Sequence, residues 1–216
     1  MKQSLQHHID LLLSRYPALE TCRGSILQAY DILETCFASG HKLLVAGNGG
    51  SCADSEHIVG ELMKGFKLPR KCSMDFAAQL CRIDQARGAE LAEKLQGSLP
   101  AIALDGHQGL NTAFLNDVPG GGLLLYAQQL NGYGNEGDVF LGISTSGNSK
   151  NILYATVVAR AKGMKVIGLT GAKGGELAEV SDVAIKVPQT ETYMIQELHL
   201  PVYHTLCLML EERFFG

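Results

Sequence analysis

Short apolar runs alternate with helical segments along most of the chain, and this alternation is the feature that most restricts its fold. Five runs are typical of strands buried on both faces of a sheet: 42–46, 100–104, 138–143, 165–170 and 183–187. The connections between strands and helices are short. We therefore predict an α/β fold with a doubly wound, five-stranded parallel sheet, in which ligands bind at the carboxyl ends of the strands.

The chain of 216 residues, 46% of them hydrophobic, is long enough for one full core, so we predict a single domain over 1–216. Residues 1–40 are expected to form two helices that cap the sheet or contact another subunit. Their apolar stripes include Leu5, Ile9, Leu12, Leu13, Ile26, Ile32 and Phe37. Segment 67–99 begins with several cations and contains a predicted helix at 86–95. We interpret it as a lid or an oligomer contact.

Charge and hydropathy argue against several classes of function. The formal net charge is -4 and no long basic run is present, which makes nucleic acid an improbable partner. No apolar stretch approaches the ~20 residues of a membrane span, and the polar start has no signal-peptide core. A cytoplasmic protein is expected. The six cysteines lack the spacing of zinc motifs and are interpreted as reduced, packed thiols.

The first polar turn, Gly47-Asn48-Gly49-Gly50-Ser51, follows the run at 42–46 and opens a helix. Its glycines permit positive φ and let the backbone pass close to a ligand, while Ser51 supplies a hydroxyl at the helix start. The turn matches neither GxGxxG nor GxxxxGK[ST], so by itself it is weak evidence for any one ligand. It indicates an anion or sugar site.

His57 and Glu61 stand four residues apart in the helix after this turn, so their side chains share one face. Such a pair is most often part of a solvated face. In company with the glycine-rich turn, it suits two metal ligands or a base and its partner.

A second polar turn, which includes Ser144, Thr145, Ser146 and Ser149, follows the run at 138–143. Hydroxyls and free N–H groups at a helix start favour phosphate, although one hydroxyl alone would be an ordinary helix cap. Asn116 and Asp117 end a short helix and either cap it or face the site.

The last helix is predicted at 192–214, with a kink at Pro201 because proline lacks the helical N–H donor. Gln196 and His204 lie eight residues apart and can border one seam of the helix, whereas His199 points elsewhere. A lone histidine in such a helix is usually a satisfied core residue, so His204 gains interest only from its companions.

Together, GNGGS, His57-xxx-Glu61, Asn116-Asp117, STSGNS and IQELHxxxxH resemble the sugar isomerase (SIS) domain of the phosphoheptose isomerase family. The resemblance implies a flavodoxin-like homotetramer that uses zinc to convert sedoheptulose 7-phosphate to D-glycero-manno-heptose 7-phosphate. It implies that Glu61 is the base and His204 the acid. The implied zinc ligands are His57, Glu61, Gln196 and His204. The implied substrate contacts are Asn48, Gly49, Gly50, Ser51, Glu61, Asn116, Asp117, Ser144, Thr145, Ser146, Ser149 and Gln196.

The chain departs from the family pattern in three places. Tyr193-Met194 replaces an Asp-Arg pair, Lys64-Gly65 replaces an arginine, and segment 67–99 is longer than usual. The alternative function is a non-catalytic tetrameric SIS protein that senses phosphosugars or associates with a replication initiator. Retention of His57, Glu61 and His204 favours the enzyme.

Overall fold

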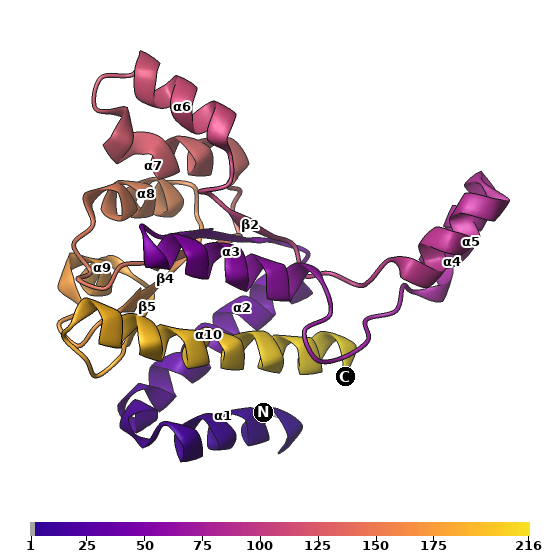
Figure 1. The fold of residues 1–216 in the computed structure, drawn as a ribbon, viewed down its shortest axis with the longest axis horizontal. Coiled ribbons are helices and arrows are strands. Elements are labelled where there is room, and N and C mark those ends of the chain that lie inside the picture. Colours follow the sequence, from indigo (N-terminus) through magenta and orange to yellow (C-terminus); the bar gives the residue numbers. More distant parts are fainter. Residues whose placement is uncertain (1–2) are drawn as a thin grey trace.

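A five-stranded, all-parallel sheet forms the centre of the computed structural model, which describes residues 3–216 (Figure 1). The strands are β1 (Leu43–Ala46), β2 (Ala101–Ala103), β3 (Val139–Ile143), β4 (Lys165–Thr170) and β5 (Val183–Lys186). Their spatial order is β2-β1-β3-β4-β5, the flavodoxin-like order of a doubly wound sheet. The prediction of the fold class is confirmed. Because the order reverses between β1 and β3, the loops after these two strands border the crevice where such folds bind ligands.

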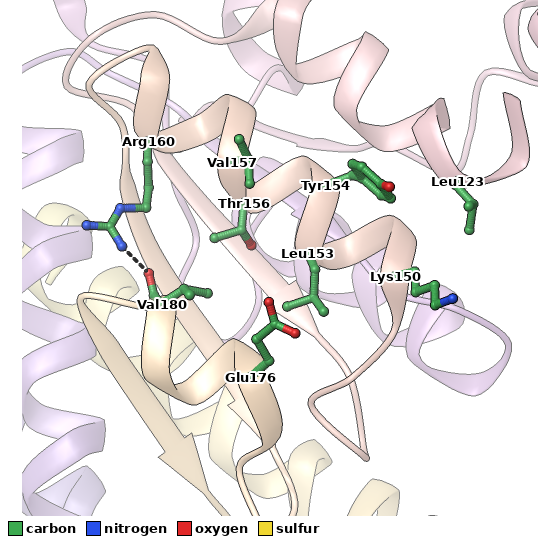
Figure 2. A pocket seen from close by; sticks show the side chains of 9 residues that line it. All are labelled: Leu123, Lys150, Leu153, Tyr154, Thr156, Val157, Arg160, Glu176 and Val180. Atoms are coloured by element: carbon green, nitrogen blue, oxygen red, sulfur yellow. Dashed lines mark hydrogen bonds between the residues drawn. The ribbon is translucent and has the colours of Figure 1, made fainter. Parts of the chain in front are cut away.

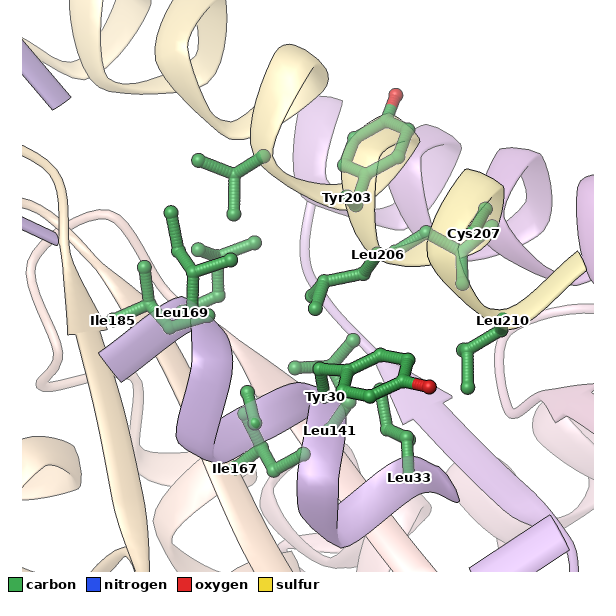
Figure 3. Packing of buried hydrophobic residues seen from close by; sticks show 14 of the residues in the cluster. Tyr30, Leu33, Leu141, Ile167, Leu169, Ile185, Tyr203, Leu206, Cys207 and Leu210 are labelled. Carbon is green, nitrogen blue, oxygen red and sulfur yellow. The ribbon is translucent and has the colours of Figure 1, made fainter. Parts of the chain in front are cut away.

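Alternate residues of the strands pack on opposite faces of the sheet. On one face, Leu43 and Val45 of β1 join the larger apolar cluster with α1 (Gln3–Arg15), α2 (Arg23–Ala38), α3 (Gly50–Met63) and α10 (Thr192–Phe215). Figure 3 shows Leu206 and Leu210 of α10 facing the sheet residues of this cluster. On the other face, Leu44 and Ala46 pack with α7 (Gly121–Tyr133), α8 (Lys150–Ala161) and α9 (Gly175–Val180). A 3-10 turn, η1 (Pro17–Cys22), connects α1 and α2.

The N-terminal helices are part of the core of this chain. Of the stripes listed above, only Ile32 is not fully buried, and it still packs against the larger cluster. The stripes are covered within one chain, as a cap on the sheet requires, so they give no argument for the alternative role of a subunit contact. These apolar side chains pack against the sheet and α10. The periodicity of 1–40 alone could not reveal that surface.

Segment 67–99 forms a helical hairpin that stands away from the sheet, at the right of Figure 1. It consists of α4 (Met74–Ile83), which we had not predicted, and α5 (Gln85–Lys94). None of the residues of α4 is buried, and only Gly88 of α5 is. Ser73 and Asp84 cap the two helices by accepting hydrogen bonds from Phe76 N–H and Arg87 N–H. The hairpin is therefore stabilised by its helix caps and by the packing of α4 against α5.

The remaining elements agree with the sequence within a few residues at their ends. The short helix α6 (Gln108–Asp117) packs on α7 at the edge of the molecule (Figure 1). Pro201 is accommodated inside α10, which runs without interruption from Thr192 to Phe215. Among residues 3–216, no helix is both long and apolar enough to cross a membrane.

Candidate functional site

The loop after β1 folds tightly against the start of α3. Gly49 has φ +57°, and a Cβ on Gly47 would lie 2.3 Å from the carbonyl oxygen of Ser51, so both positions require glycine. Ser51 is buried, while Asn48, Gly49 and Gly50 are exposed. The structure thus presents backbone and the Asn48 amide at the surface, as a ligand-binding turn requires.

The loop after β3 brings two of its hydroxyls together. Ser144 is buried, and its Oγ lies 2.9 Å from Ser149 Oγ. Ser146 is exposed, and its Oγ accepts a hydrogen bond from Asn148 N–H at 3.2 Å. No side-chain hydrogen bond caps the start of α8. Its first N–H groups and these hydroxyls are therefore suited to an anion.

A reciprocal pair of amides connects the two loops. Asn48 Nδ2 donates to Asn151 Oδ1 at 3.0 Å, and Asn151 Nδ2 donates to Asn48 Oδ1 at 2.8 Å. Asn151 was missed by the sequence analysis. Its position just inside the helix after the serine-rich turn was the only signal available. The pair fixes the spacing of the loops at the crevice between β1 and β3.

Two histidines and a carboxylate meet where α3 passes α10. His57 Nε2 lies 3.3 Å from Glu61 Oε1 and 3.4 Å from His204 Nε2. Lys64 Nζ donates to the other Glu61 oxygen, Oε2, at 2.8 Å. Burial, and then the neighbouring His57, lower the pKa of His204 below its ordinary value despite the opposing charge of Glu61. The predicted association of His57, Glu61 and His204 is present, and His204 lies away from the core.

A second layer of polar groups lies behind His57. The Tyr203 hydroxyl donates to Asp54 Oδ1 at 3.0 Å and lies 3.1 Å from His57 Nδ1. Burial, and then the charge of Asp54, raise the pKa of Tyr203 above its ordinary value, so its hydroxyl stays protonated. The sequence analysis missed both residues. Asp54 precedes His57 by three positions, a spacing that would have placed it on the same face of α3.

Gln196 stands apart from the other three predicted ligands. A Cβ on Gly50 would lie 2.6 Å from Gln196 Nε2, which places this amide against the first turn of α3. Since α10 rises 1.5 Å per residue, Gln196 is about 12 Å along the helix from His204. Across residues 3–216, the Gln196 amide lies against Gly50 and forms no hydrogen bond with the other three predicted ligands.

Asn116 and Asp117 lie at the end of α6. Both side chains are exposed, and Asn116 Nδ2 donates to Asp117 Oδ1 at 2.9 Å. Within residues 3–216 neither side chain hydrogen-bonds to the loops after β1 and β3.

His199 is fully buried, and burial lowers its pKa to about 4, as expected for a neutral core histidine.

The donor set fits zinc in its chemistry and in part of its geometry. Ligands at 2.0–2.1 Å from a tetrahedral ion lie about 3.3 Å from one another, close to the two distances around His57. Between residues 3 and 216, however, no three His, Cys, Asp or Glu side chains form a complete metal-binding group. His57 takes part in both short contacts, one with Glu61 and one with His204. For Gln196 to bind the same ion, its side chain has to rotate away from Gly50.

A furrow also lies outside the predicted site. It has a volume of about 610 Å³ and runs along α8, between Leu123 of α7 and Glu176 of α9 (Figure 2). None of its lining residues belongs to the predicted site. A second groove of about 530 Å³ lies between α1 and α10 and includes His204, Arg15 and Lys67. His204 therefore borders this groove as well as contacting His57.

Comparison with known proteins decides the family. The chain is 40% identical over 179 residues to phosphoheptose isomerase from Aneurinibacillus thermoaerophilus, covering 83% of this chain and 76% of the relative. It is 33% identical to the enzyme of that name from Akkermansia muciniphila over 216 residues, which is 100% of both chains. The chain belongs to the phosphoheptose isomerase family.

The solved structure of a phosphoheptose isomerase from Francisella tularensis is similar in fold. The match has a TM-score of 0.74 at 31% identity and covers 98% of this chain and 100% of that one. The SIS domain model matches residues 85–171. This part of the chain contains the serine-rich loop after β3, whereas His57, Glu61, Gln196 and His204 lie outside it.

A buried ion pair, also missed from the sequence, supports the helix that carries His57 and Glu61. Arg70 donates to the carbonyl oxygens of Leu62 at 2.6 Å and Glu61 at 2.8 Å, and its Nε donates to Glu211 Oε1 at 2.8 Å. Glu211 also accepts hydrogen bonds from the N–H groups of Phe66, Lys67 and Leu68. Arg70 thus caps the end of α3 and ties it to α10 at the base of the α4–α5 hairpin.

Proposed function

We propose that the chain converts sedoheptulose 7-phosphate to D-glycero-manno-heptose 7-phosphate with the help of a bound zinc ion. That it is a phosphosugar isomerase, of the class that interconverts aldoses and ketoses, follows from its family. The observation that carries the proposal is the convergence of His57 Nε2, Glu61 Oε1 and His204 Nε2 where α3 passes α10. Their chemistry is that of proton transfer.

Ketose–aldose isomerisation moves a proton between two adjacent carbons and another between their oxygens. Glu61 is the base for the carbon-bound proton, because its Oε1 faces the cluster while Lys64 holds Oε2. His204 is the acid at the substrate oxygen. Its lowered pKa makes loss of that proton easier, as a group that returns the proton in each cycle requires.

His57, Glu61 and His204 would hold the zinc ion, with Gln196 completing the set after a change in its side-chain orientation. When bound, zinc supplies Lewis-acid polarisation of the substrate carbonyl. Glu61 has two carboxylate oxygens, so one oxygen remains for base catalysis if the other is a ligand. The Glu61 side chain then serves both predicted roles. His204 Nε2 has a single lone pair, so this nitrogen acts as the acid only while it is not bound to the metal ion.

The phosphate belongs at the other end of the site. The loop after β3 offers the hydroxyls of Ser144, Ser146 and Ser149 and the free N–H groups of α8. His57 lies seven residues into α3, about 10 Å along the helix from the turn at Gly50, and the Asn48–Asn151 pair joins this turn to the loop after β3. An extended sugar chain of several carbons spans this distance, which supports a substrate with phosphate at one end and carbonyl at the other.

The test is a panel of phosphorylated ketoses of five, six and seven carbons, with the aldose product identified by NMR. Full-length protein should turn over the seven-carbon substrate with the highest kcat/KM and contain zinc when purified. Loss of activity on chelation and its return with zinc would support the metal. A protein that binds these sugars without converting any of them would instead support the phosphosugar-sensing alternative.

A further inference from the structure

The hydroxyl of Tyr203 lies between a carboxylate and the imidazole of His57. Its ring is 2% exposed and packs in the larger apolar cluster, and Figure 3 shows the hydroxyl directed away from that cluster. The rings of Tyr203 and His57 meet edge to face, with centroids 5.5 Å apart. The hydroxyl therefore has a fixed position and two polar neighbours, Asp54 Oδ1 at 3.0 Å and His57 Nδ1 at 3.1 Å.

The donors and acceptors in this chain of contacts have one consistent arrangement. A phenol has a single proton, and an ionised carboxylate can only accept. If Tyr203 donates to Asp54, its oxygen is left as an acceptor for an N–H at His57 Nδ1. The proton of the neutral imidazole then resides on Nδ1, which leaves the Nε2 lone pair directed at Glu61 and His204.

We propose that Tyr203, oriented by Asp54, is a positioning residue that keeps the proton of His57 on Nδ1 and its Nε2 free to bind a cation. Without the Tyr203 oxygen, that proton is no longer held at Nδ1. It can move to Nε2 and be donated to Glu61 Oε1, 3.3 Å away, which would occupy both side chains with each other.

The consequence for metal binding rests on the proposed function, whereas the position of the proton does not. Partners behind a metal-binding histidine commonly change metal affinity by about 10- to 100-fold when they are removed. Tyr203 is suited to this role because it is rigid, buried and in contact with the nitrogen opposite the proposed ligand atom.

The experiment uses full-length protein with ¹⁵N-labelled histidine. In metal-free protein at pH 8, ¹⁵N NMR of the imidazoles distinguishes an Nδ1–H tautomer from an Nε2–H tautomer and from imidazolium. His57→Gln identifies the His57 signals among the seven histidines. We expect the Nδ1–H form in the unaltered chain and the Nε2–H form in Tyr203→Phe. Asp54→Asn, which retains the tyrosine, should shift the tautomer in the same direction.

Zinc affinity, measured by competition with a chelator, is the second readout. Tyr203→Phe should bind zinc about 10- to 100-fold more weakly. Tyr30→Phe is the matched control, because it also removes the hydroxyl of a buried tyrosine of the larger cluster, and Tyr30 has no hydrogen bond to His57 in the described part of the chain. It should change neither readout.

The outcomes separate the inference from the proposed function. An Nε2–H tautomer or an imidazolium in the unaltered chain would overturn the inference, and so would an Nδ1–H signal that Tyr203→Phe leaves in place. If the tautomer depends on Tyr203 as expected but the unaltered chain binds no zinc, the positioning role stands and the zinc proposal fails.

Discussion

Glu61 is the residue on which the proposed chemistry depends most directly. We expect Glu61→Gln to abolish turnover, because an amide cannot accept the carbon-bound proton, while phosphosugar binding stays within about tenfold. Single-turnover assays and calorimetric titration with substrate measure the two effects separately. Undiminished isomerisation by the variant would remove Glu61 from the role of base.

The serines of the loop after β3 test the phosphate end of the site. Ser144→Ala with Ser149→Ala removes both hydroxyls of the 2.9 Å pair without altering the backbone N–H groups of α8. KM should rise several-fold or more for a phosphorylated sugar and change little for the same sugar without phosphate. Equal increases for both sugars would point to a packing role for the pair.

For single residues, the sequence predicted which side chains carry the chemistry better than it predicted which side chains contact one another. The spacing of His57 and Glu61 on one helix was sufficient to place them together. His204 joins them through the packing of α3 against α10, which no local pattern contains. Tyr203 and Asn151 were missed because each acts through a partner more than a hundred residues away. Gln196 was assigned to the metal by resemblance alone, and here it lies against Gly50.

Among the secondary-structure elements, α3 depends on the buried pair of Arg70 and Glu211 at its C-terminal end. Glu211→Gln leaves the guanidinium buried with weaker acceptors, so the free energy of unfolding should fall by about 3–5 kcal/mol, measured by urea denaturation. Glu90→Gln is the control, because it breaks the exposed Lys94–Glu90 pair and should have little effect.

The same pair predicts a pH dependence. Burial alone would raise the pKa of Glu211, but hydrogen bonds from Phe66, Lys67 and Leu68 N–H and from Arg70 outweigh it and lower the pKa below 4.5. The stabilisation is therefore complete above pH 4.5 and is lost as the pH falls through the lower folded-state pKa. Glu211→Gln should show a shallower loss of stability over this acidic range in urea titrations. A slope equal to that of the unaltered protein would contradict the assignment.

The α4–α5 hairpin can be tested by deletion. Lys71 and Gln96 pair as an antiparallel bridge at its base, so a two-glycine turn can replace residues 72–95. Because α4 and α5 bury almost nothing in the body, the melting temperature should stay within a few degrees. A collapse of the fold would show that the hairpin stabilises the domain.

The prediction of strands was accurate because continuous apolar runs are distinctive, whereas α4 was missed because its apolar side chains remain exposed.

For the whole molecule, exposed apolar side chains mark where other copies of the chain can pack. Met74 is 88% exposed, Ile83 85% and Val157 66%, and they lie on the hairpin and on α8, away from the N-terminal helices. We expect light scattering to give four times the 23.2 kDa mass of the chain. Glutamate at Met74, Ile83 and Val157 should lower that mass. A monomer at micromolar concentration with full activity would contradict the prediction of a tetramer.

The N-terminal helices belong to the core of the chain, so their deletion tests folding and does not test subunit assembly. Deleting residues 1–38 should unfold the domain, because Ile9, Leu19 and Ile26 are fully buried in the larger cluster. A loss of assembly after this deletion would say nothing about the interface.

The contact between Arg70 and Glu211 also sets an order of events during synthesis. The two residues are 141 positions apart, so a ribosome completes α3, with His57 and Glu61, long before Glu211 has been made. Until then Arg70, which caps the end of α3, lacks its carboxylate partner, and the neighbour that brings His204 is absent. The nascent chain can form the sheet in stages as it emerges. The cluster of His57, Glu61 and His204, by contrast, is assembled only when α10 leaves the ribosome.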